Sequence, residues 1–128
     1  MQRIGIKESI PVDNGSRGAL SCNIDLETGT LGIAKSIKKN TEFKIHPDSK
    51  KQIEGIVIPN WIEIKKQMIN LMNNFPYLKF VAWDILITNN GICVIEANSS
   101  SGVNILQINE GQKNKELGNF YRKNGIIK

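Results

Sequence analysis

The chain has 128 residues and a formal net charge of +5, with 40% hydrophobic and 23% charged residues. This balance is typical of one soluble globular domain and excludes a disordered chain. No apolar run approaches the roughly 20 residues of a membrane-spanning helix, and the start lacks the long apolar core of a secretory signal. We therefore expect a cytoplasmic protein with no membrane span.

The positive charge does not indicate a nucleic-acid partner, because the lysines are scattered through the chain and no basic stripe is interleaved with aromatics. The same positive charge would also favour the binding of phosphate groups. With His46 as the single histidine and no CxxC motif, a zinc site is not expected. Cys22 and Cys93 lie within apolar alternation, so we expect small core residues rather than a disulfide.

The first part of the chain predicts strands. "RIGIKESIP", residues 3–11, alternates like a strand with no partner before it, and "GALSCNID", residues 18–25, is a second strand. "DLETGT" then gives a turn with Gly29, and "TLGIA", residues 30–34, is the returning strand of a hairpin.

The middle of the chain predicts a loop and then a helix. Residues 35–59 lack a sustained period, so we expect a long loop broken by a short strand at 54–58. Asn60 is a good N-cap residue, and apolar side chains then recur at helical spacing through 61–74.

The later part predicts a β-hairpin from "LKFVAWDILIT" (78–88) and "ICVIEAN" (92–98), joined by a three-residue loop whose Gly91 takes a left-handed bulge position. Helices are expected at 103–112 and 114–123. The fold class expected is α+β: a largely antiparallel sheet of about five or six strands, with the 60–74 helix packed on one face.

Register in this hairpin brings three polar side chains together. If the loop is 89–91, Thr88 faces Ile92, which puts Asp84 directly opposite Glu96 and leaves Asn98 on the same strand face as Glu96. A one-residue error in the loop would move Asp84 to the other face.

Facing carboxylates repel, so this geometry needs a compensating charge. Oxygen ligands without His or Cys fit Mg²⁺ or Mn²⁺, which take their remaining ligands from water and substrate phosphates. The alternative is a solvated face on which Asp84 and Glu96 pair with surface lysines. Acid–base catalysis by the two carboxylates also stays open, although Asn98 favours a metal because it cannot transfer a proton.

Another candidate site is "VDNGSRGAL", a turn that precedes a strand and contains Asn14, Gly15, Arg17 and Gly18. Such a turn can present backbone N–H groups and a guanidinium to phosphate. Asp-Asn-Gly is also a common turn sequence without any ligand.

Several segments carry a family resemblance when they are taken in order: "VDNGSRGALSCNIDLETGTL", "HPDS", "IPNW", "VAWDILIT" and "VIEANSSSGVNILQ". As a set they resemble the carboxy-terminal half of the sugar-transfer-associated ATP-grasp proteins, which are relatives of the ligases that add glutamate to ribosomal protein. The resemblance covers about residues 3–107. It implies an ATP-dependent ligase with two Mg²⁺ ions and an acyl phosphate intermediate, acting in cell-surface polysaccharide or peptide modification on a small-molecule or sugar-linked acceptor.

Carried over residue by residue, the resemblance assigns Asp84, Glu96 and Asn98 as magnesium ligands, with Glu96 bridging both ions. The resemblance also puts Asn14, Arg17 and Gly18 near the terminal phosphate or activated carboxylate, with Arg17 as the catalytic cation. On the acceptor side it puts His46 and Gly102.

The sequence departs from the family pattern at Ala19, Ala82 and Lys50, where glycines are common, and at Ser101, where proline is common. The resemblance implies that the amino-terminal half, which holds adenine and carries the lid, is absent, so residues 1–128 are expected to form one partial ATP-grasp domain. It is expected to be a truncated gene product, one fragment of a split coding region, or a subunit completed by an upstream polypeptide. The alternative is a noncatalytic truncated domain that serves as a partner or sugar-binding module.

Overall fold

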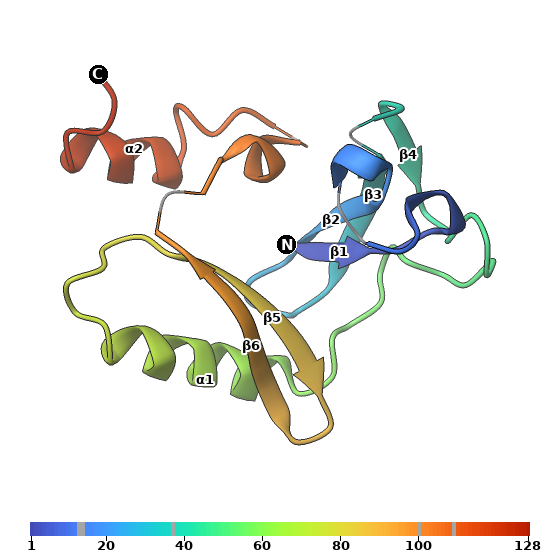
Figure 1. Cartoon of the computed structure of the whole chain (residues 1–128), viewed down its shortest axis with the longest axis horizontal. Coiled ribbons are helices and arrows are strands. Elements are labelled where there is room, and N and C mark those ends of the chain that lie inside the picture. Colours follow the sequence, from blue (N-terminus) through green and yellow to red (C-terminus); the bar gives the residue numbers. More distant parts are fainter. Residues whose placement is uncertain (13–14, 37, 100, 109) are drawn as a thin grey trace.

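The computed structural model describes residues 1–12, 15–36, 38–99, 101–108 and 110–128. It is an α+β fold in which every strand pairing is antiparallel, as expected. The strands form two sheets rather than one: four strands in the order β1-β2-β3-β4, and a separate two-stranded sheet of β5 and β6. Figure 1 shows the hairpin of the second sheet crossing α1, with α2 standing apart from both sheets.

The strands of the larger sheet are β1 (Gln2–Ile4), β2 (Leu20–Ile24), β3 (Leu31–Ser36) and β4 (Thr41–Phe43). The hairpin strands are β5 (Ala82–Thr88) and β6 (Gly91–Asn98), and the helices are α1 (Trp61–Asn73) and α2 (Glu116–Lys123). Three 3₁₀ turns, η1 (Lys7–Ser9), η2 (Gly15–Arg17) and η3 (Asn104–Gln107), complete the described elements.

The opening strand is shorter than predicted and has a partner. β1 ends at Ile4 and pairs with β2, so that Arg3 lies opposite Ser21. Its expected continuation is instead η1, which the buried Ser9 closes: the Ser9 hydroxyl accepts from Ile6 N (3.0 Å) and donates to Ile6 O (2.9 Å). The local hydrogen bonds of the Ser9 side chain thus stabilise a turn here in place of a longer strand.

The hairpin between β2 and β3 is confirmed, and its turn depends on Asp25. One Asp25 oxygen accepts hydrogen bonds from Thr28 N (2.7 Å), the Thr28 hydroxyl (2.8 Å) and Glu27 N (3.0 Å). Gly29 follows with φ 77°, a conformation that favours glycine. The sequence signal of Asp followed by Gly therefore identified the turn correctly.

These bonds hold the pKa of the Asp25 carboxyl below its usual range, led by the donation from Thr28 N. A lowered pKa stabilises the fold at pH above the unfolded value, about 4 for a carboxyl, and this contribution is lost as the pH falls through the folded value. We expect Asp25→Asn to be less stable than wild type in urea at pH 7, with the gap closing below about pH 4. A gap that stays constant from pH 7 to pH 3 would contradict this account.

Two predictions in the middle of the chain are wrong. The stretch 35–59 contains β4, which the sequence did not signal because its residues are polar and few. The strand expected at 54–58 is a turn with only an isolated bridge between Thr30 and Val57. Asn60 precedes α1 as expected, but it has φ 56° and its side chain makes no capping hydrogen bond.

The end of the chain follows the prediction in part. The helix expected at 103–112 is only the short turn η3, whereas the final helix is present as α2. Across the described part of the chain, no helix has the length and apolar character to cross a bilayer.

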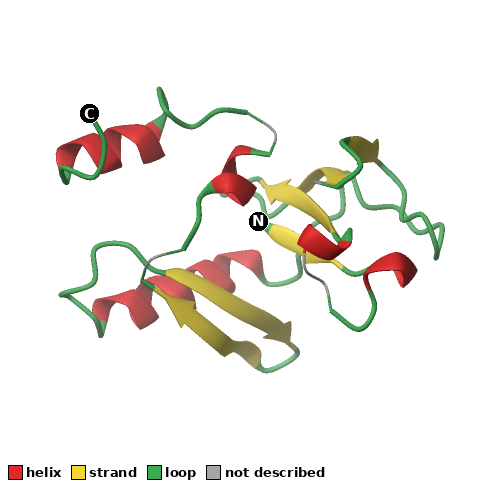
Figure 2. Ribbon diagram, turned by 45° about the horizontal axis from the view of Figure 1, so that its top comes forward, coloured by secondary structure: helices red, strands yellow, loops and turns green. Residues whose placement is uncertain are grey.

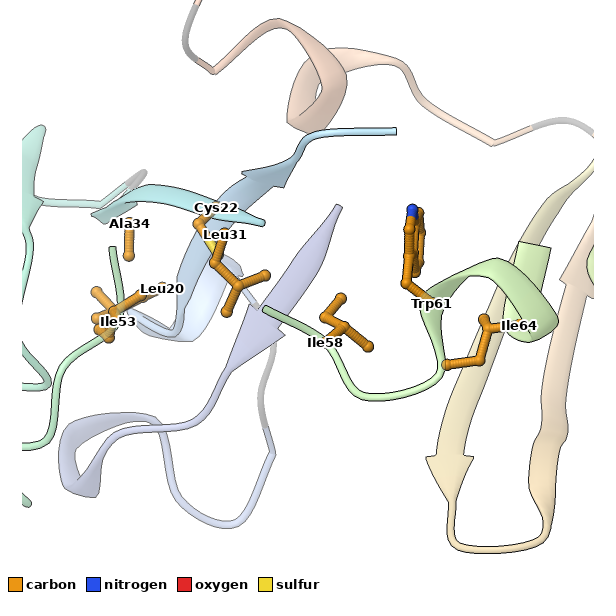
Figure 3. Packing of buried hydrophobic residues seen from close by; sticks show 8 residues of the cluster. All are labelled: Leu20, Cys22, Leu31, Ala34, Ile53, Ile58, Trp61 and Ile64. Carbon is orange, nitrogen blue, oxygen red and sulfur yellow. The ribbon is translucent and has the colours of Figure 1, made fainter. Parts of the chain in front are cut away.

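One hydrophobic core connects the larger sheet to α1, and Figure 3 shows its eight buried side chains. Cys22 is fully buried and free, as predicted, and burial raises the pKa of its thiol. Cys93 is exposed, contrary to the prediction, because it lies on the hairpin face opposite to that of its neighbour Ile92, which packs against this core. The buried set consists of Leu20, Cys22, Leu31, Ala34, Ile53, Ile58, Trp61 and Ile64.

The hairpin packs on α1 through one face only (Figures 1 and 2). Trp83 Nε1 lies 3.0 Å from Met72 Sδ, the Trp83 and Phe75 ring centroids are 5.7 Å apart, and Ile92 N donates to Gln67 Oε1 at 3.1 Å. Because side chains alternate along a strand, Asp84 lies on the face opposite to Trp83.

Candidate metal and phosphate site

Asp84 and Glu96 are direct cross-strand partners, as the sequence predicted. The predicted route to this pairing was wrong by one residue, because the loop is two residues long and Thr88 pairs with Gly91, not with Ile92. A β-bulge then shifts the register between Asp84 and Ile85, with Ile85 opposite Val94 and Asp84 opposite Glu96. Without this bulge, Asp84 would face Ile95, and the two carboxylates would not share a face.

Asn98 completes the group on the same strand face as Glu96, and we call Asp84, Glu96 and Asn98 the trio. The Asn98 Nδ2 donates to Glu96 Oε1 at 2.9 Å. This bond turns the carboxamide so that its nitrogen faces the carboxylate, which leaves the Asn98 oxygen available to a further partner. The trio therefore presents carboxylate and amide oxygens from two neighbouring strands.

Arg3, which no pattern in the sequence indicated, supplies a positive charge to the trio. Its Nη2 lies 3.1 Å from Asp84 Oδ2, and the two side chains are 34% and 35% exposed. The alternative reading of this face named surface lysines as partners for the carboxylates. The compensating cation comes instead from β1 of the other sheet, a long-range contact that no local spacing could reveal.

A hollow of about 820 Å³ opens between β1, α1 and β5, beside this ion pair. Arg3 and Asp84 lie on its wall together with Trp61, Lys65 and Met68. Its size is within the range of small-molecule and cofactor sites, and such sites combine apolar walls with a few polar groups in this way.

The predicted phosphate turn lies apart from the trio. Arg17 ends η2 and is exposed, and among the described residues it makes no hydrogen bond or ion pair with any member of the trio. Gly18 has φ 101°, which a residue with a Cβ rarely adopts. Asn14 lies outside the described residues.

The surroundings of Gly18 already hold an internal anion. A Cβ on Gly18 would lie 3.9 Å from the Glu8 carboxyl, which pairs with Lys39 and, at 3.8 Å, with Lys38. The hydrogen bond from Lys39 holds the pKa of Glu8 below its usual range. An incoming phosphate at this turn would therefore meet Glu8 as well as the basic side chains.

Both ring nitrogens of His46 are used within the chain. Nδ1 accepts from Asp48 N and Ser49 N, each at 3.2 Å, and Nε2 lies 3.0 Å from Gly5 O. With Nδ1 accepting, the proton lies on Nε2 and points at the Gly5 carbonyl. A substrate-side role for His46 would require this last bond to be exchanged.

Gly102 lies elsewhere again, in the segment that follows β6. It lines a second hollow of about 660 Å³ with residues of α2, including Leu117 and Tyr121. Nothing lies within 4 Å of the position that a Cβ would occupy at Gly102, so the backbone here is open to a ligand.

The trio is thus the one set of predicted site residues that the described structure brings together. Within the described residues, no group of three or more His, Cys, Asp or Glu side chains could hold a metal ion. The trio has two carboxylates and an amide, a set that suits a cation whose remaining ligands are water and phosphate oxygens.

Comparison with known proteins bears on most of the chain. The model of one protein family, described as sugar-transfer associated ATP-grasp, matches residues 1–120. No curated protein and no solved structure matches. The family match covers the larger sheet, α1, the hairpin and the first part of α2. The chain therefore belongs to the sugar-transfer associated ATP-grasp family, and its function is of the ATP-grasp type.

Proposed function

We propose that this chain is the ATP- and Mg²⁺-binding part of an ATP-grasp ligase that activates a carboxylate as an acyl phosphate for a small-molecule or sugar-linked acceptor. The observation that carries the proposal is the pairing of Asp84 with Glu96 beside Asn98 on one strand face. The proposed setting is the cytoplasm, in the modification of cell-surface polysaccharide or peptide.

The donor set fits Mg²⁺ or Mn²⁺. Both are hard cations that prefer oxygen ligands, and both usually bind through one or two carboxylates plus phosphate oxygens. In the proposed site, Asp84, Glu96 and Asn98 would hold the metal: the two carboxylates would provide the charge, Glu96 would be the ligand shared by two ions, and Asn98 would add a neutral oxygen. The bound cation would neutralise phosphate charge during phosphoryl transfer.

The remaining roles are proposed by resemblance to the family. Arg17 would stabilise charge on the terminal phosphate or activated carboxylate, with Asn14 and Gly18 beside it. His46 and Gly102 would lie on the acceptor side. The hollow beside Arg3 and Asp84 supports the proposal, since it has the volume of a small-molecule site and combines apolar walls with a few polar groups next to the trio.

Calorimetric titration with Mg-ATP tests the proposal, using the chain alone and then together with any polypeptide encoded directly upstream. We expect heat of binding for wild type in at least one of these combinations and a loss of at least about tenfold in affinity for Asp84→Ala, since one ligand and one charge are removed. No heat in any combination would rule out nucleotide binding by this chain.

A noncatalytic role, as a partner or sugar-binding module, is the second candidate. The Arg3–Asp84 ion pair favours it, because a partly exposed pair between two sheets can be purely structural. In that case Asp84→Ala would lower the stability of the fold, and Mg-ATP would give no heat with either protein.

A further inference from the structure

The Arg3 side chain is a cation of the protein itself that pairs with Asp84 of the trio and so links the two sheets. Arg3 is held in β1 by its pairing opposite the buried Ser21, and Asp84 is held in β5 by its pairing opposite Glu96. Their ion pair at 3.1 Å therefore joins backbones that share no strand pairing in the described structure. Arg3 and Asp84 both lie on the wall of the hollow, where their ion pair places the guanidinium beside the trio.

We infer that Arg3 makes the trio selective for a metal–phosphate complex over the free metal ion. This inference rests on the proposed function. A divalent cation at Asp84 would approach the same carboxylate that Arg3 holds, and the two positive charges repel at this separation. Since the two side chains are only 34% and 35% exposed, solvent screens that repulsion incompletely. A free cation is thus disfavoured.

For a cation that is bound to phosphates, attraction between Arg3 and the phosphates offsets the repulsion between Arg3 and the cation. The guanidinium has several N–H donors in a planar fork, which suits phosphate as well as carboxylate. Arg3 can exchange Asp84 for a phosphate oxygen, which frees the carboxylate for the metal and adds a contact to the ligand. The same residue that opposes the free ion therefore supports the metal–nucleotide complex.

The test compares Arg3→Met with wild type for two probes, MnCl₂ alone and MnCl₂ with ATP, by following the electron paramagnetic resonance signal of unbound Mn²⁺. Methionine keeps an unbranched stem without the charge. We expect Arg3→Met to bind free Mn²⁺ about tenfold more tightly and Mn-ATP about tenfold more weakly than wild type.

Lys35→Met is the matched control, because it also removes one positive charge and breaks an ion pair of 2.9 Å, with Glu42, between β3 and β4, which pair with neither strand of the hairpin. It should change either affinity by less than about twofold. Arg3→Lys keeps the charge and should disfavour free Mn²⁺ as wild type does. Arg3→Gln repeats the test if Arg3→Met loses the native circular dichroism spectrum.

The outcomes separate the two proposals. If wild type binds Mn-ATP but the neutral variants bind free Mn²⁺ no more tightly than wild type, the role of Arg3 is wrong and the metal site stands. If no variant and no wild-type protein binds Mn²⁺ with or without ATP, the proposed function fails, and the inference about Arg3 fails with it.

Discussion

Glu96→Gln should weaken binding of Mn-ATP by at least about tenfold, the largest functional effect that we expect from a single isosteric change. Glutamine keeps the shape of the side chain but removes the charge that faces Asp84. Asn98→Ala should cost less, about threefold, because it removes a neutral oxygen and leaves both carboxylates. Both losses can be measured from the Mn²⁺ resonance signal in the presence of ATP.

Glu42→Gln is the control for this comparison, since Glu42 is also a carboxylate in an antiparallel strand pair, with Lys35 as its partner. It should leave the affinity for Mn-ATP unchanged. Equal losses for Glu96→Gln and Asn98→Ala would argue against Glu96 as the ligand that bridges two ions, and a loss in Glu42→Gln would indicate a general charge effect.

Gly29→Ala should destabilise the fold by about 3 kcal/mol or more, the largest stability effect expected from one added methyl group. Gly29 has φ 77°, and a Cβ there would lie 2.4 Å from Trp61 Cγ. Trp61 cannot easily retreat, because it is buried in the core and its Nε1 donates to Leu26 O at 3.0 Å. Urea denaturation followed by circular dichroism measures the free energy of unfolding.

Gly55→Ala separates backbone strain from steric overlap. Gly55 has a similar φ of 84°, but nothing lies within 4 Å of the position of its Cβ. Strain alone should cost about 1–2 kcal/mol in this variant. If Gly29→Ala costs no more than Gly55→Ala, Trp61 adapts to the added methyl and the close packing against Gly29 is not rigid.

Local signals predicted much of the fold correctly. The Asp25 turn, the helix after Asn60 and the β5–β6 hairpin each depend on residues close in sequence, such as the Asp-to-Gly spacing or helical periodicity. Two of the misses in the fold also have local physical causes. Ser9 closes a turn where alternation suggested a strand, and β4 is too short and polar to produce a pattern.

Some features of the site could not be predicted from local patterns in a single sequence. The pairing of Asp84 with Glu96 was predicted from a loop one residue too long, and the bulge between Asp84 and Ile85 restored the correct partner. Arg3 was not identified, because its contact with Asp84 spans two sheets. The division into two sheets was missed for the same reason: alternation reports that a strand exists but not which edge it joins.

The most direct test of the central claim is paramagnetic broadening in nuclear magnetic resonance spectra of the ¹⁵N-labelled chain during titration with Mn-ATP. We predict that the backbone amide signals of Asp84, Glu96 and Asn98 broaden first, while those of Glu42 and Glu54 in the rest of the chain stay sharp. Broadening that begins at other carboxylates, or none at all at saturating Mn-ATP, would contradict a metal–nucleotide site at the trio.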